Sequence, residues 1–395
     1  MKRPPKEALL AAVMGGLFFA IPARAINLDE FERHDYDLTS SSRAWSLGPA
    51  SRLRLFLDIY NVTDFYDFES NDTPGFVDGT WLADTVRPTA TILWDERYRI
   101  QLGAVARRGY GEKKGFGSVD PWMQLLWQPA KPVSVILGNL DIPHYYLPAI
   151  LLPLNYVRDQ ATETGVQLLH RRENWYDDLY FNYRLQDTPE HNEKFDLGFV
   201  HRNFLWEFLR LDYQSHWIHE GGTLNPHPFD TLNEIASAAG LGAQLHPLPF
   251  CIIGARWAYL HSHRRVDSSN PALVEHVNGD GHYYEAFTRI NRFKFGYAYW
   301  RSHRYSHEGG DPWFTLGRLQ LVTARWDVIL GRDFNVQLGY TGYFPGNDNP
   351  GISRLLMSAI HLQVAWQFSI PIHEWNTPAA APEGQPIPAR WDEGL

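Results

Sequence analysis

Residues 360–368 read Ile-His-Leu-Gln-Val-Ala-Trp-Gln-Phe, and this stretch decides the fold class. Its large apolar residues occupy every second position, whereas His361, Gln363 and Gln367 fall on the opposite face. Successive side chains of a β-strand point to opposite faces, so this pattern predicts a strand with one apolar and one polar face. A helix would need apolar residues three and four positions apart.

The same alternation recurs along the chain from about residue 52 to residue 370. Clear examples are residues 52–60, 98–107, 178–185, 205–217 and 293–301. The connections between these runs alternate in length. Short turns lie at 95–97, 128–132, 172–175, 202–204, 246–249, 291–292 and 331–333, and longer links at 69–79, 111–117, 141–160, 186–192, 219–230, 261–279, 303–312 and 344–351. We therefore predict about 16 antiparallel strands.

The regular sorting of short and long links separates two all-β architectures. A soluble sandwich turns its apolar face inward, whereas a membrane barrel turns it toward lipid and keeps a polar lumen. Outer-membrane barrels have tight periplasmic turns and larger external loops. The 15 Trp, 20 Tyr and 22 Phe residues also suit the aromatic belts of a barrel wall. The sequence thus predicts an all-β, transmembrane antiparallel β-barrel with short periplasmic turns and longer external loops.

The two ends of the chain differ from the region between them. Lys2, Arg3 and Lys6 precede an apolar stretch at 8–21 and a small-residue cleavage site at 23–25, a pattern typical of a signal peptide. An uncleaved anchor is the alternative, although the apolar stretch is short for a spanning helix. We expect a signal peptide at 1–25, a periplasmic or plug segment at 26–50, the barrel at 51–371 and a Pro-rich periplasmic tail at 372–395.

Charge and cysteine content exclude several functions. The formal net charge is −9, and removal of the presumed signal peptide with its net charge of +3 leaves about −12, which argues against nucleic-acid binding. Cys251 is the only cysteine, so neither an intramolecular disulfide nor a cysteine metal cage is possible. We expect no cofactor and no bound metal.

In strand number and loop rhythm, residues 52–370 resemble the Gram-negative porin family. The resemblance implies an outer-membrane location, contact with outer-membrane lipid, a possible homo-oligomer, and a third external loop that folds into the barrel. The third long link here, 141–160, is the longest and is rich in apolar residues. The constriction-loop residues expected on this basis are Tyr145, Tyr146, Asn155, Arg158 and Asp159.

Assigning faces by alternation gives an expected lumen with thirteen cations and seven anions. The pore-lining residues predicted in this way are Arg52, Arg54, Arg87, Arg99, Arg107, Arg184, Arg210, Asp212, Arg256, Arg289, Lys294 and Arg325. The surplus of cations predicts a preference for anionic solutes. Arg210 with Asp212, and Arg325 with Asp327, are two residues apart on one face, so each couple is expected to pair locally.

Candidate catalytic and metal-binding residues are sparse. His261 and His263, and also His303 and His307, have spacings that suit zinc or copper, but we expect solvated histidines near external loops. Ser215 beside His216 fails as a nucleophile and base, because neighbours on a strand point to opposite faces. Neither a Gly-x-Ser-x-Gly elbow nor a His-Glu-x-x-His helix is present. Asp and Glu residues are plentiful enough for a glycosidase, but nothing singles out a pair of carboxylates. We therefore expect no enzymatic activity.

Two functions remain open. The first is a porin-like channel for the diffusion of small hydrophilic solutes, favouring anions. The second is a structural sleeve or export conduit for a polysaccharide or for partner proteins such as periplasmic cytochromes.

Overall fold

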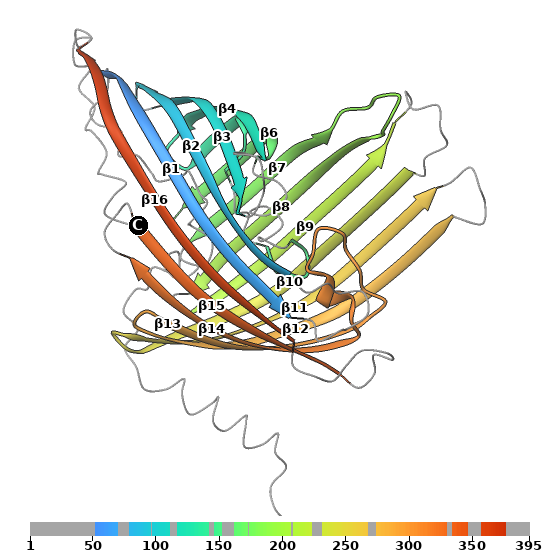
Figure 1. Ribbon diagram of the computed structural model, residues 1–395. Helices are drawn as coiled ribbons and strands as arrows, with labels where there is room; N and C mark the ends of the chain where they lie inside the picture. The colour runs from blue at the N-terminus through green and yellow to red at the C-terminus, as the bar shows by residue number, and fades with distance from the viewer. Residues whose placement is uncertain are drawn as a thin grey trace, which may run out of the picture.

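The structure is a computed structural model in which sixteen strands close into one antiparallel barrel (Figure 1). Each strand pairs with its neighbours in the sequence, and β1 pairs with β16 to close the ring. The described residues are 52–69, 79–95, 97–110, 117–141, 146–151, 162–172, 174–206, 208–222, 231–267, 274–329, 334–346 and 357–376. The expected signal peptide, the segment 26–50 and residues 377–395 of the expected tail lie outside them.

The strands are long because the inward and outward faces alternate without interruption over many residues. Their bounds are β1 Arg52–Glu69, β2 Gly79–Trp94, β3 Tyr98–Gly109, β4 Ser118–Ala130, β5 Val133–Asn139, β6 Thr164–Arg172, β7 Trp175–Leu185, β8 Glu193–Trp206, β9 Leu209–Gly221, β10 Thr231–Leu248, β11 Cys251–Asp267, β12 Glu275–Ile290, β13 Phe293–His303, β14 Arg318–Ile329, β15 Phe334–Pro345 and β16 Met357–Asn376. A 3₁₀ turn, η2 (Pro312–Thr315), lies between β13 and β14.

The predicted fold class is confirmed, including the strand number and the alternation of short and long connections. Strands β10 and β11 are joined by two residues, as are β12 and β13, whereas β13 and β14 are separated by fourteen. Strand β16 continues to Asn376, beyond the expected barrel end at residue 371, because β1 provides pairing partners as far as Arg52.

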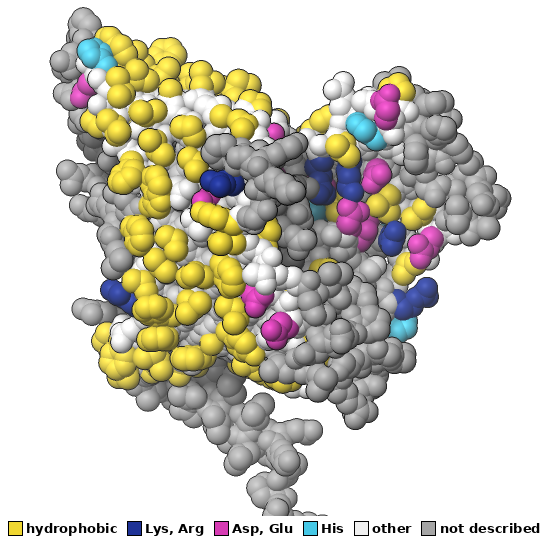
Figure 2. Space-filling view, in the orientation of Figure 1, with side chains coloured by type: hydrophobic (Ala, Val, Ile, Leu, Met, Phe, Trp, Pro, Cys, Tyr) yellow, Lys and Arg dark blue, Asp and Glu magenta, His cyan; other side chains and the backbone are white. Residues whose placement is uncertain are grey.

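The outward face of the barrel is apolar. On β9, β10 and β11 the large exposed hydrophobic side chains are at odd positions, for example Tyr213, Leu241 and Trp257, apart from Leu248 at the end of β10. Figure 2 shows hydrophobic side chains spread over the wall that contains β1, β2 and β16. Such a surface is stable against lipid and unfavourable in water, so the barrel spans a membrane. Among the described residues, no helix is long and apolar enough to cross a bilayer.

The main buried cluster lies inside the barrel, against the opposite face of the same strands. It contains Tyr146 and Ile150 from the link between β5 and β6, and Tyr305 and Phe314 from the link between β13 and β14. These side chains pack on even, inward positions of β8 to β11, such as Ala238 and Ala258. Two links therefore fill part of the lumen.

Candidate functional site: the barrel lumen

The predicted pore-lining side chains that the structure describes lie on the inward face. Arg87, Arg99 and Arg210 are buried, and Arg54, Arg107, Arg184, Arg256, Arg289, Lys294 and Arg325 are half-buried. Asp212 is buried among them, and the side chain of Arg52 lies outside the described set. Whether these residues select solutes remains a prediction.

The lumen predicted from the sequence did not include several inward acids. Asp64 and Glu234 are each 2% exposed and lie on the inward faces of β1 and β10. Lys194 is an inward cation that was also left out. Among the described residues, the surplus of cations in the lumen is therefore smaller than alternation indicated, because Asp64 and Glu234 outnumber Lys194.

Two inner segments cross the lumen and contact each other. Inner segment A is residues 146–151, and inner segment B is residues 304–317. The backbone N–H of Asp311 donates to the carbonyl of Pro148 at 2.8 Å, and the Tyr305 hydroxyl donates to the carbonyl of Ala149 at 3.0 Å. A Cβ on Gly310 would lie 2.2 Å from the carbonyl oxygen of Ala149, so glycine permits this close approach.

The wall beneath inner segment A is lined by small residues. Ala236, Ala238 and Ala258 are buried on inward positions of β10 and β11. A Cβ on Gly198 of β8 would lie 2.4 Å from the Tyr146 hydroxyl oxygen and 2.1 Å from a ring carbon of Tyr180. The missing side chains leave the space that the segment occupies.

Inner segment A is also bonded to β9. The backbone N–H of Leu147 donates to the Gln214 side-chain oxygen at 2.7 Å, and the Tyr146 hydroxyl donates to the carbonyl of Ser215 at 3.0 Å. The prediction that the third long link folds inward is therefore correct for residues 146–151. Of the expected constriction-loop residues, Tyr146 is 3% exposed within this segment, whereas Tyr145, Asn155, Arg158 and Asp159 lie outside the described residues.

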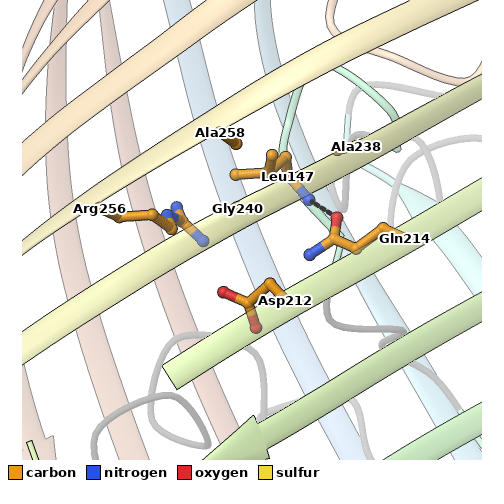
Figure 3. A pocket seen from close by; sticks show the side chains of 7 residues that line it. All are labelled: Leu147, Asp212, Gln214, Ala238, Gly240, Arg256 and Ala258. Atoms are coloured by element: carbon orange, nitrogen blue, oxygen red, sulfur yellow. Dashed lines mark hydrogen bonds between the residues drawn. The ribbon is translucent and has the colours of Figure 1, made fainter. Parts of the chain in front are cut away.

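A small cavity of about 10 Å³ lies between inner segment A and the wall, close to the volume that one water molecule needs. Figure 3 shows Leu147 above Gly240, with Arg256 to the left, Gln214 to the right and Asp212 below. Arg256 donates to Glu285 at 2.6 Å. The charged side chains next to this cavity therefore already have partners within the wall.

The predicted local pairs are both present. Arg210 lies 2.7 Å from Asp212, and Arg325 lies 3.0 Å from Asp327. Asp212 also lies 3.5 Å from Arg202 of β8, so two cations share one carboxylate. The wall there has more positive than negative charge, even though each cation has a neighbouring acid.

Histidine residues join inner segment B to the wall. His307 Nε2 lies 2.8 Å from His216 Nδ1 of β9, and His307 Nδ1 lies 3.2 Å from Glu234 Oε1 of β10. The expectation that His307 is a solvated loop histidine is wrong, because the segment turns inward and leaves it 6% exposed. His216 points inward and Ser215 outward, in agreement with the argument from alternation.

Sequence reasoning missed this histidine pair. His307 lies in a link, where alternation gives no direction, and its partner is 91 residues away. The available signal was the run of alanines and glycines at inward positions of β10 and β11, which shows that something else fills the lumen. Among the described residues, no group of three His, Cys, Asp or Glu is placed to hold a metal ion.

The fold resembles solved porins at very low sequence identity. OccAB1 of Acinetobacter baumannii is 8% identical with a TM-score of 0.51, and the match covers 84% of this chain and 99% of that one. OprD of Pseudomonas aeruginosa is 10% identical (TM-score 0.48; 84% and 97% covered), and the anion-selective porin of Comamonas acidovorans is 6% identical (TM-score 0.49; 80% and 99% covered).

A search of curated proteins finds no match. The sequence model of one family does match, over residues 47–332, and this range includes β1 to β14. The match covers well over half of the chain, so the chain belongs to the family described as lipid A 3'-O-deacylase-type.

Proposed function

We propose that this chain is an outer-membrane channel through which small hydrophilic solutes diffuse. The observation that carries the proposal is the closed barrel with a lipid-compatible outer wall and charged, hydrogen-bonded side chains inside. A barrel of this strand number normally encloses an aqueous path. The two inner segments would then restrict that path and set the size of the solutes that pass.

The proposed preference for anions rests on the short-turn end of the lumen. Among the described residues, seven inward cations lie within five residues of a short turn: Arg99, Arg171, Arg202, Arg210, Arg289, Lys294 and Arg325. Asp212 and Asp327 form ion pairs with three of them, and Asp178 is a third buried acid near a short turn. This entrance therefore has a surplus of positive charge. Fixed charges of one sign at a pore entrance raise the local concentration of the opposite ion.

Recordings from purified protein in a planar bilayer test both parts of this proposal. We expect step-like increases in conductance and, in a salt gradient, a reversal potential with the sign of an anion-selective pore. A reversal potential with the sign of a cation-selective pore would contradict the proposed anion preference but would still support the channel. A folded protein that gives no conductance would favour the structural sleeve or export conduit instead. Separate experiments would then have to test its contact with lipid and its self-association.

The channel proposal includes the expectation that the protein is not an enzyme. This expectation needs a test, because the description of the family names a deacylase. A second candidate function, acyl-ester hydrolysis, is favoured by one feature of the outer wall. Ser237, His261 and Asp280 are paired directly across β10, β11 and β12 and all face outward. Directly paired residues have Cβ atoms about 5 Å apart, so serine, imidazole and carboxylate are neighbours in one row.

The position of this row on the wall suits an ester of a membrane lipid. Trp257 and Tyr259 precede His261 on the same outward face, and aromatic rings of this kind sit at the membrane interface. Two residues further along β11, on the same outward face, His263 Nδ1 lies 2.8 Å from Asn278 Oδ1, which shows that paired side chains here come into contact. The Ser237 hydroxyl lies 3.0 Å from that of Ser215, so it would have to rotate toward His261.

In this second function, the Ser237 oxygen would add to the ester carbonyl while His261 takes its proton and passes it to the departing alcohol. Water would then release the acid by the same route. The test is fatty-acid release from phospholipid and lipopolysaccharide vesicles by the wild type, by Ser237→Ala and by His276→Ala, an exposed outer histidine that serves as a control. Release that Ser237→Ala abolishes and His276→Ala preserves would show an enzyme, whereas no release from the wild type would exclude this row as a hydrolase.

A further inference from the structure

Four ionisable side chains form a continuous buried line from the wall into inner segment B. His216 Nε2 lies 3.9 Å from Asp196 of β8, His216 Nδ1 contacts His307 Nε2 at 2.8 Å, and His307 Nδ1 contacts Glu234 at 3.2 Å. All four side chains are 3% exposed or less. The line joins three strands to a link that crosses the lumen.

The His216–His307 contact is possible in only some protonation states. At 2.8 Å one ring nitrogen donates and the other must accept with a free lone pair. In the neutral pair, His307 donates from Nδ1 to Glu234 and its Nε2 accepts from His216 Nδ1. One added proton is tolerated on either ring, because His216 Nε2 then points at Asp196, or His307 then donates to both Glu234 and His216. With both rings protonated, two N–H donors meet face to face.

Further contacts between described residues also hold this end of inner segment B to the wall, including the ring of Tyr305 against that of Trp300. The backbone N–H of Glu308 donates to Glu234 at 2.9 Å, and the Glu308 carboxylate lies 2.5 Å from Lys194 of β8. The backbone N–H of Ser306 donates to the Ser262 hydroxyl at 3.3 Å. Glu234 therefore accepts from both His307 and the next backbone amide. The protonation state of His307 thus affects how inner segment B is held to β10.

We propose that the His216–His307 pair is an acid-sensitive latch that holds inner segment B across the lumen, and that a second proton on the pair releases the segment and widens the path. The regulation of conduction rests on the proposed channel function, whereas the release of the segment does not. Histidine is the side chain whose charge changes most readily between about pH 5 and pH 8. The structure has the segment in the docked position, and the released position is the second state that such a switch requires.

Other ionisable groups pack around the latch and affect its response. Those facing it from neighbouring elements are Lys194, Asp196, Glu220, Glu234, Tyr146 and Tyr180, together with Arg184 on Asp196 and Glu308 on inner segment B. Protonation of Asp311 has the opposite effect on the docking of inner segment B. Burial raises the pKa of its carboxyl to about 7, so it gains a proton as the pH falls through that value, which favours docking. The Asp311→Asn background therefore isolates the histidine effect.

The test is bilayer recording of the full-length protein at about pH 8 and about pH 5, where histidine changes charge. In the Asp311→Asn background we expect mean conductance to rise about tenfold on acidification, the change produced by a shift of about 1.4 kcal/mol in the docked–released equilibrium. His307→Gln can donate to Glu234 and accept from His216 but cannot be protonated, so its response should be lost. His276→Gln, on the outer surface, should respond as the parent does.

Hydrogen exchange of residues 304–317 supplies a readout that does not depend on conduction. Faster exchange at the acidic pH in the parent, compared with His307→Gln at the same pH, supports the latch even if no variant conducts, in which case only the channel proposal fails. Equal exchange in the two proteins, or an unchanged acid response of His307→Gln in the bilayer, overturns the latch and leaves the channel proposal standing.

Discussion

The guanidinium carbon of Arg87 lies 4.1 Å from the ring centre of Trp122, and Tyr60 is stacked against it at 4.8 Å. These residues come from β2, β4 and β1 and share the inward face. The rings hold the cation in place by the attraction between a positive charge and an aromatic face, and they leave its N–H edge available for hydrogen bonds.

Arg87→Gln should weaken the preference for anions and lower stability by about 2 kcal/mol, the magnitude for a desolvated cation–π contact. The measurement is the reversal potential in a salt gradient, together with the midpoint of heat-modifiable gel migration. Arg108→Gln is the matched control, because Arg108 is exposed on the outward face of the neighbouring β3. An equal loss of selectivity in both variants would contradict a specific role for Arg87.

Gly198→Ala should loosen inner segment A. The new Cβ would meet Tyr180 at 2.1 Å and the Tyr146 hydroxyl at 2.4 Å, so the tyrosines would have to move. Overpacking of this kind costs about 1–3 kcal/mol, and we expect higher single-channel conductance as Tyr146 is displaced. Gly339→Ala is the control, since its Cβ would meet nothing closer than 3.8 Å. Unchanged conductance in Gly198→Ala would mean that Tyr146 does not restrict the path.

Alternation and loop rhythm were sufficient to predict the barrel, because they are local signals repeated in every strand. The pairs Arg210–Asp212 and Arg325–Asp327 were predictable for the same reason, since both members share one strand. The His216–His307 contact was not predictable, because its direction is set by the tertiary path of a link. Asp64 and Glu234 were not predicted because apolar residues share their inward faces, such as Val62 and Phe68 near Asp64 and Ala236 near Glu234, so polarity does not distinguish the two faces there.

The position of inner segment B should depend on the protonation of Asp311. Its carboxyl accepts from the backbone N–H of Trp313 at 3.1 Å and is otherwise desolvated, which raises its pKa from 3.8 to about 7. The folded state thus binds a proton that the unfolded chain has lost. The stability from this neutral acid is complete below pH 3.8, and it is lost as the pH rises toward 7.

Asp311→Asn should therefore raise the apparent melting temperature at pH values above about 7 and change it little at about pH 4. Asparagine keeps the acceptor for Trp313 and carries no charge. The measurement is thermal unfolding in detergent across this pH range, with Asp95→Asn at a short turn as the control. A shift of the same size at both ends of the range would show that the carboxyl is not the titrating group.

Asp212→Asn offers a direct comparison of one ion pair in two environments. Asp212 lies 2.7 Å from Arg210 with only 6% of its side chain exposed, whereas Asp267 lies 2.7 Å from Arg265 with 39% exposed. Both acids stand two residues after their arginine, so the local geometry is matched. The two pairs differ in how much water surrounds them.

Removing the charge of Asp212 leaves Arg210 and Arg202 without the carboxylate that they share. A buried cation that loses its partner is strongly destabilised, and we expect a loss of about 3 kcal/mol for Asp212→Asn but less than about 1 kcal/mol for Asp267→Asn. The same substitution adds one net positive charge to the lumen, so the reversal potential should move further to the anion side. A stable Asp212→Asn variant with unchanged selectivity would mean that water reaches and screens these arginines freely, and the short-turn entrance would then have no selective field.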